Sequence, residues 1–292
     1  LFTVDKGMVD NLGELFDYLG ASNLAFWVST PSFAEICVSS GKFGKDLLPN
    51  LEKFLFCGEV LTHKLVDELF SRFPGVSVIN TYGPTEATVL VTTVDVTEEM
   101  ARDERPIPIG RPLGEVLFRV VDEEGNDLPD NERGELLIVS DNVGPGYYKR
   151  PDLTEKAFFT DRTGKRGYRT GDKCFSDGGM YYYCGRLDNQ LKVNGFRVEI
   201  EDIERNLTNV DNVARAAVLP VFEEEKVSYL VAFVLLTEED GLSSMKRQTK
   251  IKNELAAVLP SYMIPRKITA LPSFPLNVNG KVDKKELSKR LG

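Results

Sequence analysis

The sequence is poor in the residues that build metal, redox and histidine-dependent sites. It contains one histidine, His63, and four cysteines, Cys37, Cys57, Cys174 and Cys184, among 292 residues. A single histidine excludes a multi-histidine metal site and disfavours a catalytic triad with a histidine base. The cysteine spacings match no zinc motif, and four thiols are too few for a disulfide scaffold. This cysteine usage is typical of a reducing compartment, so we expect a cytoplasmic location.

Long apolar runs and an excess of positive charge are also missing. No apolar stretch approaches the roughly 20 residues that cross a bilayer, so we expect no membrane insertion. Asp and Glu outnumber Lys and Arg by 45 to 36, and the net charge of −9 argues against nucleic acid as the main partner. The 42% apolar and 28% charged content is typical of a globular protein, and the length predicts more than one domain.

Three regions with different patterns of helical and extended segments follow one another along the chain, and together they predict the fold class. Helical and extended segments alternate over residues 7–95, as in an α/β domain with a mainly parallel sheet. Residues 106–185 hold short extended segments broken by Gly, Pro, Asp and Asn, which is typical of a small antiparallel β-barrel or sandwich. The remaining pattern is that of a compact α+β domain. We therefore expect an α/β portion at 1–105, a β-barrel-like subdomain at 106–185 and an α+β domain at 186–292.

The most specific stretch is GRLDNQLKVNGFRVEIEDIE at 185–204, where the second and third regions meet. A charged loop is followed by a segment of alternating polar and apolar residues, and then by a tight turn at Asn194-Gly195. Carboxylates at 199–204 stand where the first turn of a helix favours negative charge. Taken alone, this pattern predicts a hairpin followed by an acidic helix.

Three further turns carry groups suited to a polar ligand. The segment NTYGPTE at 80–86 follows an extended run, and ligands of open α/β sheets gather at the carboxyl ends of strands. YRTGD at 168–172 and NGKVD at 279–283 place a carboxylate and a lysine in two more turns. Taken singly, each has a plainer alternative: an ordinary turn, common loop chemistry and a solvated basic tail, respectively.

In this order and at these spacings, the motifs resemble those of the adenylate-forming enzymes, the superfamily of acyl-CoA synthetases, luciferases and peptide-synthetase adenylation domains. The resemblance runs through YGPTE at 82–86, GELLIVSDNVGPGY at 134–147, YRTGD at 168–172, the stretch at 185–204, LPSYMIP at 259–265 and NGKVD at 279–283. It implies a two-step reaction. A carboxylate and ATP give an acyl-adenylate and pyrophosphate, and a phosphopantetheine thiol then takes the acyl group.

The resemblance implies a role for each motif residue in binding ATP and Mg²⁺. Thr85 would contact a phosphate, and Glu86 would hold Mg²⁺, a cation that prefers carboxylate oxygen. Asp172 would accept hydrogen bonds from the ribose hydroxyls. Lys281 would place positive charge between the attacking carboxylate and the α-phosphate, so Lys281 and Thr85 are the expected catalytic residues. The expected nucleotide site is completed by Asn80, Thr81, Tyr82 against the adenine, and Arg186 beside Asp172.

The resemblance also gives the α+β domain a mechanical role. Asp188 would be the hinge of a mobile domain that carries Lys281 to the nucleotide for the first step. Rotation at Asp188 would then withdraw the lysine and bring the turn at Gly195 to the site where the thiol enters.

Residues around Cys57 resemble the branch of the superfamily that activates D-alanine. The closer similarity lies in KFLFCGEVL at 53–61, TPSFAEIC at 30–37 and NTYGPTEATV at 80–89. It implies that Cys57 leans on the α-carbon of the substrate and that Val89 forms an apolar wall nearby. The implied partners are D-alanine and a D-alanyl carrier protein with phosphopantetheine, used to alanylate teichoic acids of the cell wall. The alternatives are a peptide-synthetase adenylation domain for another small amino acid, or a noncatalytic fragment that only docks a carrier protein.

One part of the adenylate-forming pattern is missing. A Ser/Thr/Gly-rich phosphate loop should precede the TPSF segment, together with an aspartate for the substrate ammonium, and neither is present. Gly144-Pro145-Gly146 and Gly178-Gly179 are no substitute, because neither precedes a helix that could hold phosphate. We therefore expect an N-terminally incomplete adenylate-forming fold from a longer protein, which adenylates poorly or not at all as given.

Overall fold

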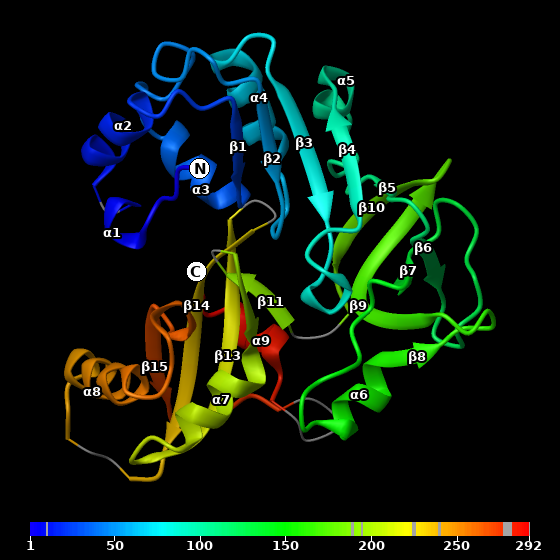
Figure 1. Ribbon diagram of the computed structural model, residues 1–292. Helices are drawn as coiled ribbons and strands as arrows, with labels where there is room; N and C mark the ends of the chain where they lie inside the picture. Colours follow the sequence, from blue (N-terminus) through cyan, green and yellow to red (C-terminus); the bar gives the residue numbers. More distant parts are fainter. Residues whose placement is uncertain are drawn as a thin grey trace. The chain divides into compact units, whose positions relative to one another are not determined.

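A computed structural model describes residues 1–9, 11–187, 190–193, 195–223, 226–238, 241–276 and 282–291. The chain divides into two compact units, unit 1 at Leu1–Asp188 and unit 2 at Asn189–Gly292. Figure 1 shows two sheets in unit 1 and one sheet in unit 2. Among the described residues, no helix is long and apolar enough to cross a bilayer.

The first sheet of unit 1 begins as a parallel sheet. Its strands, in spatial order, are β1 (Phe26–Ser29), β2 (Lys53–Phe56), β3 (Ser77–Tyr82), β4 (Thr92–Val96) and β5 (Arg111–Pro112). β1, β2 and β3 pair in parallel, whereas β4 and β5 add antiparallel. The parallel pairing predicted from the alternating pattern is therefore confirmed for the first three strands. The helices in this part of the chain are α1 (Lys6–Val9), α2 (Leu12–Gly20), α3 (Pro31–Val38), α4 (His63–Arg72) and α5 (Glu98–Arg102).

Local sequence signals explain where these helices begin. Pro31 occupies the first turn of α3, where its fixed φ fits and no N–H is needed. The hydroxyl of Thr62 caps α4 by accepting a hydrogen bond from the Leu65 N–H at 3.3 Å. Leu65 and Leu69 share one face of α4 and are buried in the core of the first sheet. Capping and amphipathic spacing therefore start α4 at His63 and turn its apolar face into this core.

The second sheet of unit 1 is antiparallel. It has the order β10 (Met180–Arg186), β9 (Arg166–Asp177), β7 (Gly134–Val139) and β6 (Leu117–Val121), while β8 (Phe158–Thr160) also pairs with β9 and follows α6 (Pro151–Ala157). In the described residues β6 and β10 do not pair with each other, so the sheet is open rather than a closed barrel. Two backbone hydrogen bonds between Ile109-Gly110 and Tyr181 connect β10 to the chain that leads into β5.

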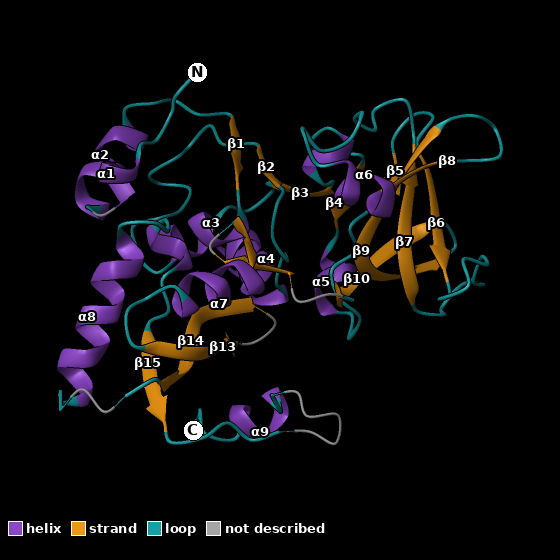
Figure 2. Ribbon diagram, turned by 90° about the horizontal axis from the view of Figure 1, so that it is seen from below, coloured by secondary structure: helices purple, strands orange, loops and turns teal. Residues whose placement is uncertain are grey.

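Unit 2 is an α+β domain, as expected. Its sheet has the order β12 (Phe196–Glu199), β11 (Gln190–Val193), β14 (Lys226–Leu236) and β13 (Val213–Glu223), with β15 (Lys267–Leu271) parallel to β14. Its helices are α7 (Ile200–Thr208), α8 (Ser244–Ala256), α9 (Lys284–Ser288) and the 3₁₀ turn η2 (Ser261–Met263). Both views show α8 beside β15, and apolar residues of α7 and α8 share one core with β14 (Figures 1 and 2). The expected fold class is confirmed, whereas domain boundaries at 105 and 185 stay a prediction.

A cluster of aromatic rings fills the core of the first sheet. Phe54 of β2 has no exposed surface, and its ring packs against those of Trp27, Phe43, Phe56 and Phe73 at centroid distances of 5.2 to 6.4 Å. Burying aromatic rings in this way removes a large apolar area from water. The sequence holds one tryptophan, so fluorescence reports directly on this cluster.

We predict that Phe54→Ala lowers the free energy of unfolding of unit 1 by about 3–5 kcal/mol, because a large cavity replaces the ring. Urea denaturation followed by Trp27 fluorescence measures the change. The matched control is Phe26→Ala on β1, where the ring is 59% exposed and the expected loss is at most about 1 kcal/mol. Equal losses in the two variants would contradict the burial argument.

Candidate active site

The first group of expected site residues lies at the carboxyl end of β3. Two of them are buried in the strand and bond to neighbouring backbone. Asn80 Nδ2 donates to the carbonyl of Pro108 at 2.8 Å, and Thr81 Oγ1 donates to the carbonyl of Phe56 at 2.8 Å. These bonds hold the end of β3 between adjacent segments. A contact of either side chain with nucleotide stays a prediction.

The loop after β3 closes on itself. A Cβ atom on Gly83 would lie 2.7 Å from Leu90 Cα, closer than side chains approach backbone, so only glycine fits. The Val91 N–H donates to the carbonyl of Tyr82 at 2.8 Å, which joins the two ends of the loop. Between them stands the 3₁₀ turn η1 (Thr85–Ala87), on which Thr85 is exposed. The loop therefore presents Thr85 at the end of the parallel strands.

Asp172 in β9 is the centre of a buried polar cluster. Its side chain accepts a short hydrogen bond from the Tyr82 hydroxyl on Oδ2 and a 2.8 Å ion pair from Arg186 Nη1 on Oδ1. Arg186 Nη1 also donates to the carbonyl of Thr170 at 2.8 Å, and the Asp172 N–H donates to Thr170 Oγ1 at 2.9 Å. The structure thus brings together three expected nucleotide-site residues, Tyr82, Asp172 and Arg186, from β3, β9 and β10.

Burial sets the charge state of this cluster. Asp172 is 6% exposed, and a carboxylate removed from water needs an opposite charge and hydrogen-bond donors. Arg186 supplies the charge. Burial, followed by the nearby charge of Asp172, raises the pKa of the Tyr82 phenol well above its usual value, so the phenol keeps its proton and donates. The arrangement is a fixed anionic acceptor, the kind of group that sugar hydroxyls bind.

Glu86 of η1 faces the segment that follows β7. The hydroxyl of Tyr147 donates to Glu86 Oε1 at 2.5 Å and lies 3.3 Å from the hydroxyl of Tyr168, while Glu86 Oε2 is buried. No role was predicted for Tyr147 from the sequence. Its signal was present all the same, since Tyr147 is the last residue of the GELLIVSDNVGPGY motif.

The two expected substrate residues are neighbours. Cys57, directly after β2, donates from Sγ to the carbonyl of Val89 at 3.6 Å, and Val89 itself is 64% exposed. Thr88 and Val89 have φ values of 65° and 63°, in the left-handed region that β-branched residues rarely adopt. Backbone strain of this kind concentrates at functional sites. The thiol of Cys57 therefore meets a strained stretch of backbone beside the exposed Val89.

Three further residues were expected to act in a hinge and in a mobile domain. Lys281 and Asp188 lie outside the described residues. Gly195 lies in the turn between β11 and β12, and its φ of 82° is one that glycine adopts readily. The roles of all three stay predictions.

A metal ion could be held here by one carboxylate. No group of three or more His, Cys, Asp and Glu side chains within the described ranges could bind a metal by itself. Mg²⁺, however, commonly takes only one or two protein carboxylates and completes its shell with water and substrate phosphates. Glu86 fits that requirement. Its Oε1 holds the Tyr147 hydroxyl, but a carboxylate offers about four acceptor positions.

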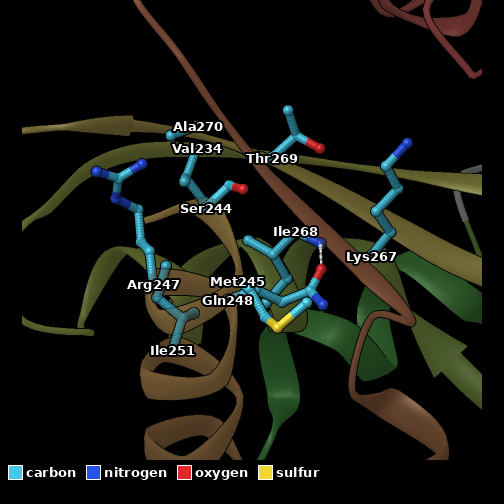
Figure 3. A pocket seen from close by; sticks show the side chains of 10 residues that line it. All are labelled: Val234, Ser244, Met245, Arg247, Gln248, Ile251, Lys267, Ile268, Thr269 and Ala270. Atoms are coloured by element: carbon cyan, nitrogen blue, oxygen red, sulfur yellow. Dashed lines mark hydrogen bonds between the residues drawn. The ribbon is translucent and has the colours of Figure 1, made fainter. Parts of the chain in front are cut away.

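Two cavities lie away from these residues. One, of about 490 Å³, lies in unit 2 between the start of α8 and β15. Figure 3 shows Arg247 and Lys267 on opposite sides of it, and Gln248, whose Oε1 accepts the Ile268 N–H at 2.8 Å. The other, of about 500 Å³, lies beside β1 in unit 1 and is lined mostly by apolar residues such as Trp27. The candidate site is therefore defined by its polar clusters rather than by these cavities.

Comparison with known protein families gives matches in both units. The model for AMP-binding enzymes matches residues 3–148, and the model for the AMP-binding enzyme C-terminal domain matches residues 202–281. A D-alanine--D-alanyl carrier protein ligase of Bacillus cereus (strain AH187) is 43% identical over 287 residues. That alignment covers 98% of this chain and 57% of the relative, so the chain spans little more than half the length of the curated relatives it matches.

Solved structures show the same similarity. The Vibrio cholerae adenylation domain AlmE, in complex with glycyl-adenosine-5'-phosphate, has a TM-score of 0.81 and 29% identity, with 97% of this chain and 53% of that chain covered. Holo-PA1221, a nonribosomal peptide synthetase protein containing adenylation and PCP domains, has a TM-score of 0.77 and 25% identity. In that case 95% of this chain and 47% of the other are covered.

The raised pKa of Tyr82 predicts a pH dependence of stability. The folded state keeps this phenol protonated, whereas in the unfolded chain it ionises near pH 10, so the free energy of unfolding falls as the pH rises above about 10. We expect Tyr82→Phe to make this decline shallower by about 1.4 kcal/mol per pH unit. Urea denaturation at a series of alkaline pH values, followed by Trp27 fluorescence, measures the slope. Identical slopes in wild type and variant would show that Tyr82 does not ionise on unfolding.

Proposed function

The chain belongs to the AMP-binding enzyme family, and from this premise we propose that its complete gene product activates D-alanine with ATP and transfers it to a carrier protein. In the first step, a carboxylate oxygen of D-alanine attacks the α-phosphorus of ATP, the bond to the β-phosphate oxygen breaks and pyrophosphate leaves. In the second step, a phosphopantetheine thiol attacks the acyl carbon, AMP leaves and the thiol proton is released. The carrier would then hold D-alanine as a thioester.

One observation carries this proposal: residues of three strands converge on the buried carboxylate of Asp172. Tyr82 and Arg186 fix its position, and it can accept further hydrogen bonds from the ribose hydroxyls of ATP. The exposed Thr85 would contact a phosphate from the adjacent loop. Tyr82 would lie against the adenine, and Asn80 and Thr81 would support that edge of the nucleotide.

Mg²⁺ would be held by Glu86 and would neutralise phosphate charge. Lys281 would stabilise the negative charge that develops between the attacking carboxylate and the α-phosphate. Its arrival and withdrawal would require rotation of the mobile domain at Asp188, followed by approach of the turn at Gly195 for thiol entry. These assignments rest on the motif resemblance and on the family match.

The choice of D-alanine rests on relatives and on the neighbourhood of Cys57. The Bacillus cereus relative named as a D-alanine--D-alanyl carrier protein ligase is 43% identical to this chain. Cys57 and Val89 lie together and would flank the α-carbon and methyl group of the substrate. The AlmE complex with glycyl-adenosine-5'-phosphate supports a second candidate, activation of glycine.

The partner and the location follow from the same proposal. A carrier protein with phosphopantetheine is supported by the name of the curated relative and by the PCP domain of PA1221. We place the reaction in the cytoplasm because it consumes ATP. The alanine on the carrier would be destined for teichoic acids of the cell wall.

Amino-acid-dependent ATP–pyrophosphate exchange on the complete gene product tests this function. We expect faster exchange with D-alanine than with L-alanine or glycine. Lys281→Ala should lower exchange by roughly 10² to 10³, because a preorganised charge is lost, and should spare thioester transfer from preformed adenylate. Lys285→Ala, a change of an exposed lysine in α9, is the matched control and should leave exchange unchanged.

Each contrary result has a separate meaning. Faster exchange with glycine would replace D-alanine by the second candidate. Exchange that persists at wild-type rate in Lys281→Ala would remove this lysine from the adenylation step. No exchange with any small amino acid would refute the proposed function.

A further inference from the structure

The loop that carries Glu86 is held by a second segment, residues 142–147. The Gly144 N–H donates to the backbone carbonyl of Glu86 at 2.8 Å, and Thr88 Oγ1 donates to the carbonyl of Asn142 at 3.0 Å. The Tyr147 hydroxyl adds the 2.5 Å bond to the Glu86 carboxylate. One backbone–backbone bond and one bond from a side chain to backbone therefore fix the loop, and a third bond fixes the direction of the carboxylate itself.

Tyr147 donates its hydroxyl proton to the carboxylate, because a carboxylate oxygen can only accept and a phenol can donate. Tyr168 belongs to β9, and its hydroxyl lies 3.3 Å from the Tyr147 hydroxyl, where it limits the movement of the phenol. A hydrogen bond between a neutral donor and a carboxylate is stronger than one between two neutral groups. Such a bond can select one orientation of the Glu86 side chain.

The backbone next to Glu86 shows that this loop does not hold its shape unaided. Thr88 and Val89 both have left-handed φ values and branched Cβ atoms. Conformations of this kind persist only where the surroundings enforce them. The bonds from residues 142–147 supply that enforcement on the side of Glu86 and Thr88.

We propose that Tyr147 is a positioning residue that orients the Glu86 carboxylate for binding Mg²⁺ together with ATP. The inference rests on the proposed function, in which Glu86 holds the cation. Tyr147 would hold one side of Oε1, and the cation would bind the carboxylate at another acceptor position. Without the phenol hydroxyl, the Glu86 side chain would sample other orientations, and cation binding would have to select the productive one.

Tyr147→Phe isolates the hydroxyl. The ring of Tyr147 packs edge-on against Phe158 at 5.3 Å between centroids, and phenylalanine keeps that contact. Tyr148→Phe is the matched control, because it removes the same atom from the next residue, which is 86% exposed. Thermal unfolding of both variants establishes that they are folded before binding is compared.

The test measures cation binding directly on the complete gene product. Mn²⁺ is the probe, titrated in the presence of ATP and followed by electron paramagnetic resonance. We expect Tyr147→Phe to raise the dissociation constant for Mn²⁺ by about 10-fold, as the loss of a hydrogen bond to a charged group predicts. The Mg²⁺ concentration for half-maximal pyrophosphate exchange should rise by the same factor, with little change in kcat at saturating Mg²⁺. Tyr148→Phe should match wild type in both measurements.

A second experiment, in the Glu86→Gln variant, separates orientation of the carboxylate from general stabilisation of the loop. In Glu86→Gln, the proposal expects weak Mn²⁺ binding and no further loss when Tyr147→Phe is added. A Tyr147→Phe enzyme with wild-type affinity for Mn²⁺, or equal losses of kcat at every Mg²⁺ concentration, would overturn the proposal. Failure of the proposed function is distinguishable, since wild type itself would then show no exchange with small amino acids.

Discussion

The burial of one carboxylate organises the candidate site. Asp172 is removed from water, so it must stay between the donors that compensate its charge, the Tyr82 hydroxyl and the Arg186 guanidinium. Tyr82 belongs to the first sheet, whereas Asp172 and Arg186 belong to the second. The requirement to pair this charge therefore ties the two sheets of unit 1 together at the end of β3. The loop that carries Thr85 and Glu86 begins there, at the end of β3.

The loop itself depends on close backbone approach and on strain. Gly83 lets the chain pass within reach of Leu90, where any side chain would collide. Thr88 and Val89 then take left-handed conformations, which place the Val89 carbonyl beside the thiol of Cys57. Thr85, Glu86 and Val89, which the resemblance assigns to phosphate, metal and acyl group, thus lie on one short loop. The conformation of this loop is constrained by its contacts with neighbouring segments. A rigid scaffold with a constrained loop is a common arrangement in catalytic sites.

Local sequence patterns predicted the elements closely. The alternation of helical and extended segments expected over residues 7–95 is seen in elements such as β2 at Lys53–Phe56 and α4 at His63–Arg72. Such elements depend on periodicity and caps within about ten residues. For residues 106–185 the pattern left a small antiparallel barrel or sandwich open, because the pairing of edge strands is not encoded locally, and the described sheet is antiparallel and open.

Only part of the candidate site could be predicted from the sequence. Tyr82 and Asp172 are 90 positions apart, and only the resemblance to a known superfamily brought them together in advance. Tyr147 closes the GELLIVSDNVGPGY motif, but its contact with Glu86 spans 61 positions and became visible only in the structure. Asn80 and Thr81 were expected in the turn after an extended run but lie within β3, and their backbone partners could not be read from neighbouring residues.

A double-mutant cycle on Tyr82 and Asp172 tests most directly whether the buried carboxylate ties the two sheets. Tyr82→Phe, Asp172→Ala and the double variant are unfolded in urea, with Trp27 fluorescence as the signal. The account predicts a coupling free energy of about 1.5–3 kcal/mol, because the two groups share a buried, charge-assisted hydrogen bond. Losses that add to within about 0.5 kcal/mol would contradict it.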